Sequence, residues 1–289
     1  MRCFSLLILL IIFQTGFSQK ITEKSLLWEI SGNGLKHKSY LFGSSEFNCV
    51  GDEKTDEKLL KIFDKTEVLL TTIDKNSPDF ETNFFSTFLI TDGTNLTDKL
   101  DEATINILKE KIDDESVNFR LMLHLRPQFF LLQMDQFSFD CQVTAGNELI
   151  LIQKAKEEEE KEIFGLNTFK DETDLIFSIP EKDALEAITF HTANFEDFKI
   201  YNQQLYQAYQ NAAIQKLYDL VIENQKNSIY LPYDIKKILD EKNSKWFPDI
   251  EIHIKQKPTF ILLDAVYLAG ENGLINKLKR KGYTVKAIQ

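Results

Sequence analysis

Leu26-Leu27-Trp28-Glu29-Ile30 and Ser39-Tyr40-Leu41-Phe42 are two short apolar runs separated by Gly32-Asn33-Gly34. Aliphatic and aromatic residues in runs of this length are typical of β-strands, and an Asn-Gly pair between two such runs is a strong signal for a tight turn. The stretch therefore predicts a β-hairpin near the start of the chain. Two similar runs, Thr259–Leu263 and Tyr283–Ile288, predict strands near its other end.

The residues between these ends have mostly helical patterns. Two further strands are predicted at Val68–Ile73 and Glu162–Gly165, and helices are predicted at Asp56–Lys65, Asp101–Asp113, Phe119–Phe137, Asn147–Lys161, Glu181–Asn224, Asp234–Lys255 and Asn272–Lys281. The third of these helices is apolar on more than one face, so we expect it to be buried. The pattern as a whole predicts an α/β fold, in which a β-sheet built from N- and C-terminal strands is flanked by a largely helical middle segment.

Composition narrows the class of protein. The 289 residues are 43% hydrophobic and 27% charged, which excludes a disordered, collagen-like or multi-spanning membrane protein. The 45 acidic against 34 basic residues give a formal net charge of -11. Because a surface of that sign repels phosphate backbones, we expect no nucleic-acid partner.

The N-terminus has the pattern of an export signal. Arg2 precedes an apolar run from Phe4 to Phe13, and a small residue, Ser18, follows a short polar stretch. This arrangement predicts a secretory signal peptide over residues 1–18. The apolar run is shorter than the roughly 20 residues that span a bilayer, so we expect no transmembrane segment in the mature chain. The mature protein is therefore predicted to be exported, either to the periplasm or to the extracellular space.

Export changes the meaning of the cysteines. Once Cys3 is removed, Cys49 and Cys141 remain as an even pair in an oxidising compartment, where a disulfide is expected and two buried free thiols are the alternative. A zinc site is not expected, because the sequence has no Cys-x-x-Cys and no paired-histidine spacing. The histidines are isolated from one another, at positions His37, His124, His191 and His253.

The same terminal segments resemble a known family. Leu26–Lys36 with Ser39-Tyr40-Leu41-Phe42-Gly43 is similar to the opening of the TraB/GumN family, and Gly270-Glu271-Asn272-Gly273-Leu274 with Lys281-Gly282-Tyr283-Thr284-Val285 is similar to its end. Between them, Gly165-Leu166-Asn167-Thr168 resembles "Gly-Leu-Glu-Thr", and Asp240–Trp246 resembles "Asp-x-Arg-Asn-x-x-Trp". The resemblance covers residues 25–288 and implies one domain of this family over residues 19–289. Many exported members also carry a cysteine pair where Cys49 and Cys141 stand.

The resemblance also implies where a catalytic site would lie. The family includes the TIKI-type secreted metalloproteases, in which two Gly-x-x-His histidines and nearby carboxylates are thought to bind a divalent metal and activate water for peptide hydrolysis. In this sequence Glu46 and Tyr267 stand at the two histidine positions, and Thr72 stands at the position of the general-base carboxylate. Asn167 replaces the glutamate of "Gly-Leu-Glu-Thr", and Lys242 replaces the arginine of "Asp-x-Arg-Asn-x-x-Trp". The glycine of the second Gly-x-x-His motif is replaced by Asp264. The retained positions are Asp74, Asp240 and Asn243.

These replacements predict a degenerate site. Imidazole is the usual ligand of zinc, a threonine cannot take a proton from water at neutral pH, and lysine lacks the bidentate fork of arginine. The favoured hypothesis is a non-catalytic protein without a cofactor that binds a peptide or an envelope partner. The alternative is a metal-dependent peptidase or other hydrolase, in which Glu46, Asp74 and Asp264 hold Mg²⁺ or Ca²⁺. A purely structural or assembly role is the third possibility.

Overall fold

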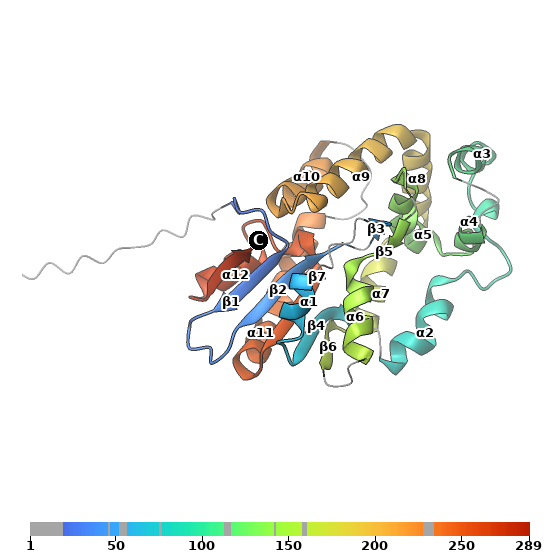
Figure 1. Cartoon of the computed structure of the whole chain (residues 1–289). Coiled ribbons are helices and arrows are strands. Elements are labelled where there is room, and N and C mark those ends of the chain that lie inside the picture. Colours follow the sequence, from blue (N-terminus) through green and yellow to red (C-terminus); the bar gives the residue numbers. More distant parts are fainter. Residues whose placement is uncertain are drawn as a thin grey trace, which may run out of the picture.

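The computed structural model describes residues 20–45, 47–51, 57–74, 77–112, 117–141, 143–157, 161–227 and 234–289 (Figure 1). The strands are β1 Leu27–Ser31, β2 Ser39–Ser44, β3 Phe47–Cys49, β4 Val68–Ile73, β5 Val143–Ala145, β6 Glu162–Asn167, β7 Thr259–Asp264 and β8 Thr284–Ile288. The helices are α1 Glu57–Phe63, α2 Pro78–Phe88, α3 Glu102–Lys111, α4 Val117–Met122, α5 Pro127–Gln133, α6 Asn147–Glu157, α7 Phe169–Phe177, α8 Glu181–Ala193, α9 Phe195–Gln210, α10 Ile214–Asn227, α11 Ile235–Gln256 and α12 Leu274–Arg280. Three short 3₁₀ segments are η1 Leu96–Asp98, η2 Met134–Ser138 and η3 Ala265–Tyr267. The predicted signal peptide, residues 1–18, lies outside the described residues.

The main sheet confirms the predicted fold class. Its strand order is β6-β4-β7-β2-β1-β8, so both ends of the chain contribute to one sheet. β1 and β2 form the predicted antiparallel hairpin, and β1 also pairs antiparallel with β8. β2, β7, β4 and β6 are parallel to one another. The sheet is therefore mixed, with a parallel half and an antiparallel half that meet at β2.

Helices cover both faces of the parallel half. Every residue of β7 from Thr259 to Leu263 is buried, as expected for a central parallel strand. Phe63 of α1 packs edge-on against Phe260 of β7, with ring centroids 5.1 Å apart. Figure 1 shows α1 and α11 on opposite sides of the strands. This follows from chain direction, because the crossover from β2 to β4 and the crossover back to β7 run in opposite senses, and right-handed connections then lie on opposite faces.

The carboxyl ends of the parallel strands meet at one edge of the sheet. Ser44, the last residue of β2, pairs with Asp264, the last residue of β7. Gly43 allows this edge to be closely packed, since a Cβ at that position would lie 2.9 Å from the Cα and Cβ of Ala265. Glycine is thus required where η3 folds over the end of β2.

The helical middle differs from the sequence prediction in detail. The single helix predicted at Phe119–Phe137 is wrong: the segment forms α4, α5 and η2 instead. The break has a physical cause, because Pro127 is the first residue of α5 and holds the preceding Arg126 in an extended conformation. Helices α2 and α7 were not predicted. The middle segment also has a hydrophobic core of its own, separate from that of the sheet, which includes Leu108, Phe130 and Ile188.

A two-stranded ribbon connects the sheet with the helical middle. β3 pairs antiparallel with β5 in the register Phe47↔Ala145, Asn48↔Thr144 and Cys49↔Val143. A disulfide joins Cys49 to Cys141, with Cα atoms 5.7 Å apart, which confirms the predicted pairing.

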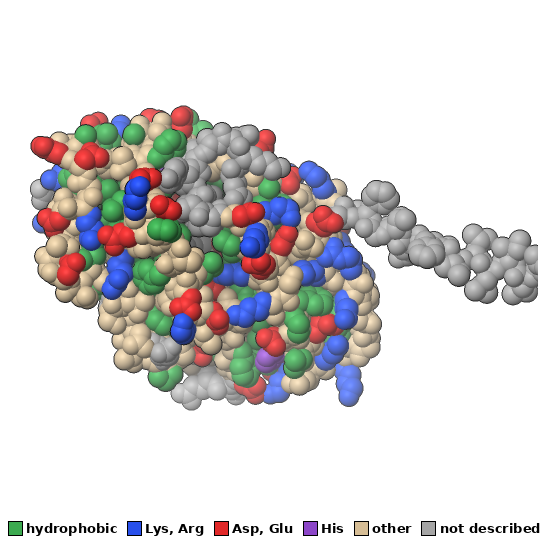
Figure 2. Space-filling model, turned by 180° about the vertical axis from the view of Figure 1, so that it is seen from behind, with side chains coloured by type: hydrophobic (Ala, Val, Ile, Leu, Met, Phe, Trp, Pro, Cys, Tyr) green, Lys and Arg blue, Asp and Glu red, His purple; other side chains and the backbone are tan. Residues whose placement is uncertain are grey.

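The described part of the chain was expected to contain no transmembrane segment and to carry many charged side chains on its surface. No helix in the described part of the chain is both long enough and apolar enough to cross a membrane. Figure 2 shows acidic and basic side chains interspersed over one face of the molecule.

Buried His191 makes the stability of the helical middle depend on pH. The side chain is 5% exposed and its ring centroid lies 4.7 Å from that of Phe198. Burial lowers the pKa of His191 from 6.5 to about 4. Between these two pH values the histidine is protonated in the unfolded chain but neutral in the folded chain. Stability is therefore lost as the pH falls below 6.5, by about 2 kcal/mol at pH 5.

The test is urea unfolding at pH 7.5 and pH 5. We expect His191→Gln to lose about 2 kcal/mol less than the wild type between the two values. An equal loss in both proteins would contradict this role of His191.

Candidate functional site

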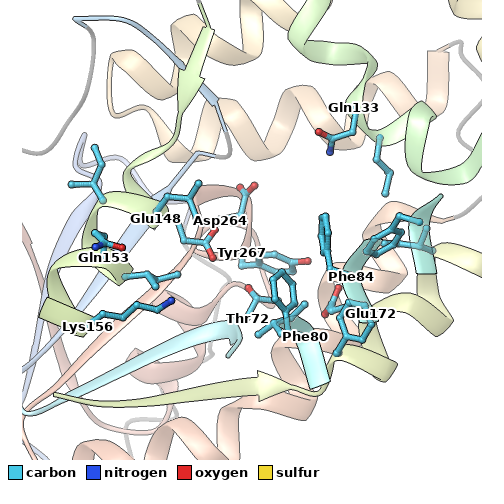
Figure 3. A pocket seen from close by; sticks show the side chains of 18 of the residues that line it. Thr72, Phe80, Phe84, Gln133, Glu148, Gln153, Lys156, Glu172, Asp264 and Tyr267 are labelled. Carbon is cyan, nitrogen blue, oxygen red and sulfur yellow. The ribbon is translucent and has the colours of Figure 1, made fainter. Parts of the chain in front are cut away.

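A large cleft lies at the carboxyl ends of the parallel strands. Its volume is about 1350 Å³. Its lining combines the ends of β4 and β7 with side chains from helices α2, α5, α6, α7 and α11. Figure 3 shows Thr72, Asp264 and Tyr267 between a wall formed by α6 and a wall that carries Phe80 and Phe84.

The first wall is aromatic. Phe80, Phe84 and Phe88 recur every four residues on α2, so they form one stripe along the helix. Their ring centroids are 5.1 and 5.0 Å apart along the stripe. Phe129 of α5 stacks on Phe88 at 4.0 Å, and Phe169 of α7 meets Phe80 edge-on at 5.5 Å. These rings form a continuous apolar surface.

The opposite wall, on α6, is mixed. Leu149 and Ile150 are 47% and 38% exposed although they are apolar, and both line the cleft. Glu148, Gln153 and Lys156 place polar groups along the same helix (Figure 3). This wall offers hydrogen-bonding groups across from an aromatic surface.

An ion pair forms part of the cleft floor. The Lys242 ammonium donates to both carboxylate oxygens of Glu172, each at 2.8 Å, and both side chains are only 15% exposed. The Asn167 amide also donates to the Glu172 carboxylate. The Asn167 amide oxygen in turn accepts from Trp246 Nε1 at 3.0 Å. Two of the predicted site positions, Asn167 and Lys242, thus form one polar network with Glu172 and Trp246.

Tyr267 completes this floor. Its ring packs edge-on against Trp246, with centroids 4.8 Å apart, and Lys242 Nζ lies 6.0 Å from the tyrosine centroid. The Asn243 side chain donates to the Tyr267 carbonyl at 3.0 Å. Tyr267 and Trp246 therefore place the Lys242 ammonium beside two aromatic rings, a favourable setting for a cation.

The acidic residues singled out from the sequence lie in different surroundings. Asp264 lines the cleft, and its Oδ1 accepts from the backbone N–H of Val266 at 3.0 Å, which caps η3. Asp74 follows β4, the strand next to β7, and Asp240 pairs with Lys236 on α11. Glu46 lies outside the described residues. Within the described ranges, no group of three or more His, Cys, Asp or Glu side chains is arranged to hold a metal ion.

The surroundings of the cleft floor shift the pKa values of two nearby side chains, Asp171 and Tyr209. The Thr168 backbone N–H, its hydroxyl and the ammonium of Lys245 lower the pKa of Asp171 to about 2, which fixes the start of α7. Burial, together with the negative charge of Asp264, raises the pKa of Tyr209. Asp171 is thus ionised and the Tyr209 phenol is neutral at physiological pH.

Comparison with known families gives one match. The TraB/PrgY/gumN family matches residues 26–287. The chain belongs to this family. No curated protein and no solved structure matches it.

The described residues around Lys242 and Asn167 do not offer a ligand set for the divalent metal that the resemblance to TIKI-type members implies. A second cation on this floor would face the positive charge of Lys242, while Glu172 already accepts from Lys242 and Asn167. Both ends of the Asn167 amide are engaged as well. Where the resemblance implies a histidine and a glutamate, the chain has Tyr267 and Asn167, and a phenol and an amide are poorer metal ligands than imidazole and carboxylate.

Sequence reasoning missed Glu172 and the aromatic wall. Glu172 belongs to no family motif, but it follows Asn167 by only five residues and could have been considered as an acidic partner for Lys242. Helix α2 could have been predicted from Ser77-Pro78, a typical N-cap followed by proline at the first helical position, and from the phenylalanines that recur every four residues after it.

The ion pair predicts strong coupling between its members. Lys242→Met leaves the Glu172 carboxylate without its cation in a site that is 15% exposed, which should cost about 2–3 kcal/mol of unfolding free energy. Adding Glu172→Leu should recover most of that loss, because the uncompensated charge disappears.

The exposed pair Lys170 and Asp174 supplies the control. Lys170→Met should cost no more than about 0.5 kcal/mol. Urea unfolding of the wild type, Lys242→Met, Glu172→Leu, the double variant and Lys170→Met measures these values, and additive losses in the double variant would contradict the coupling.

Proposed function

We propose that this chain is an exported, non-catalytic member of the TraB/PrgY/gumN family, whose cleft binds a peptide or an envelope partner. The observation that carries the proposal is the Lys242–Glu172 ion pair with its bonds to Asn167, which takes the place of a metal-ligand set on the cleft floor.

The residues at the implied base and histidine positions support a non-catalytic role. A metalloprotease needs a metal-bound water and a base to deprotonate it. The base position is Thr72, whose hydroxyl remains protonated at neutral pH. Tyr267 lines the floor at a former histidine position and packs against Trp246.

The cleft has features that suit a peptide. Ligand sites combine apolar surface with a few polar groups that fix orientation. Here the aromatic stripe of α2 can take apolar side chains, and Gln133, Glu148 and Gln153 can bond to main-chain amides. Export is supported by the signal-like N-terminus and by the Cys49–Cys141 disulfide, since disulfides persist in oxidising compartments.

Binding is tested with a displayed peptide library panned against the mature chain. We expect selected peptides to lose affinity about tenfold or more with Phe84→Ser, because a buried aromatic contact is worth about 1.5–3 kcal/mol. Phe190→Ser is the matched control, since Phe190 is 37% exposed on α8, outside the cleft lining. Equal losses with both variants, or selection of no peptide, would refute peptide binding in the cleft.

Catalysis is tested separately. The purified mature chain should contain no stoichiometric zinc, manganese or cobalt, and should not cleave a peptide library faster than buffer. Elemental analysis and mass spectrometry of the library measure both. Metal-dependent turnover abolished by Glu46→Ala or Asp264→Ala would instead support the carboxylate-site hydrolase.

A further inference from the structure

The β3–β5 ribbon connects the sheet to the start of α6. β3 follows β2 closely in the chain, and β5 leads through Gly146 into α6. The ribbon has three residue pairs, and the Cys49–Cys141 disulfide lies at one end of it. A two-stranded ribbon of this size is not stable by itself in water. It therefore depends on the disulfide and on side-chain bonds around it.

Buried side-chain bonds join the ribbon to α6 and α9. Asn48 Nδ2 donates to Asn147 Oδ1 at 3.1 Å, and Asn147 Nδ2 donates to the Tyr209 hydroxyl at 3.0 Å. These three side chains are between 0% and 3% exposed. The backbone N–H of Cys49 also donates to the Tyr206 hydroxyl at 3.0 Å. Asn147, the first residue of α6, is thus held from β3 and from α9.

The two ends of α6 are anchored in different ways. Leu151, Ile152 and Ala155 are at most 5% exposed and belong to the core of the sheet, and Lys154 pairs with Asp64 at 3.1 Å. The first turn instead exposes Leu149 and Ile150 toward the cleft. Its position depends on Asn147 and the ribbon rather than on apolar burial.

We propose that the Cys49–Cys141 disulfide, the ribbon and Asn147 form a redox-sensitive latch that positions the first turn of α6, and that reduction of the disulfide loosens this wall of the cleft. The latch regulates the binding site proposed above, and for its effect on affinity it rests on that proposed function. Its effect on α6 does not.

The chemistry is ordinary thiol–disulfide exchange with a dithiol. Cys49 and Cys141 are each half-buried rather than fully buried. A thiolate of the dithiol attacks one sulfur, which forms a mixed disulfide and releases the other cysteine. The second thiol of the dithiol then displaces the first cysteine and closes its own disulfide. Two electrons and two protons pass to the cysteines, and the dithiol is oxidised.

Hydrogen exchange of the folded mature chain, with and without excess dithiothreitol, tests the latch without any ligand. The amides of residues 151–153 bond to carbonyls of the first turn of α6 and report its opening. We expect their exchange to accelerate about tenfold more than that of residues 260–263 in β7. No acceleration at 151–153, or equal acceleration in both segments, would overturn the latch.

Two variants separate the latch from a general loss of stability. In the oxidised chain, Asn147→Ala should reproduce part of the accelerated exchange at 151–153. Asn211→Ala should not, because Asn211 is an exposed asparagine whose bonds, within the described part of the chain, are to Gln207 and Tyr209 of α9. Unchanged exchange in Asn147→Ala would remove Asn147 from the latch and overturn the proposal as stated.

Peptides selected on the oxidised chain provide the second readout. Their affinity should fall about tenfold on reduction. Unchanged affinity alongside accelerated exchange would overturn the coupling to the cleft. Failure to select any peptide would refute the proposed function alone, since exchange still decides whether α6 is latched.

Discussion

The parallel pairing of β2 with β7 is the constraint on which the rest of the structure depends. Residues about 220 positions apart are joined in this ladder, where Ser39 Oγ also accepts from the backbone N–H of Thr259. Once Ser44 pairs with Asp264, the carboxyl ends of all four parallel strands share one edge, and the chain between them must return to that edge through a helical middle segment. In open α/β sheets, ligand-binding clefts form outside the carboxyl ends of the strands, at the point where the direction of the connections reverses. The cleft of this protein lies at that edge of the sheet. Gly43 matters for the same reason, because only a residue without Cβ lets η3 fold back over this edge.

The cleft floor is held together by a partly buried ion pair and its hydrogen bonds. Lys242 of α11 pairs with Glu172 in the first turns of α7, and the Asn167 amide bonds to Glu172. Because a partly buried ammonium without a carboxylate would be costly, these residues depend on one another. The network joins β6, α7 and α11 at the floor of the cleft.

The sequence predicted the sheet better than the helices, and it identified some residues that line the cleft but not the residues they contact. Val68–Ile73 was predicted with its observed bounds, because apolar strand runs are local signals. The helix over Phe119–Phe137 failed because Pro127 overrides a continuous apolar pattern. Thr72, Asn167, Lys242 and Tyr267 were located through the family resemblance. Glu172 and the stripe on α2 were not, since their meeting with the strand ends is set by tertiary packing rather than by spacing along the chain.

Two helices that line the cleft, α5 and α6, are packed into different hydrophobic cores. On α5, Phe130 is buried in the core of the helical middle, while the adjacent Phe129 lines the cleft. On α6, Leu151 and Ala155 belong to the core of the sheet, while Leu149 and Ile150 line the cleft. Neither core alone therefore sets the distance between these two helices. That distance depends on the segments that join the cores, among them the β3–β5 ribbon with its disulfide cross-link. The geometry of the cleft can thus be altered at a junction remote from its aromatic contacts.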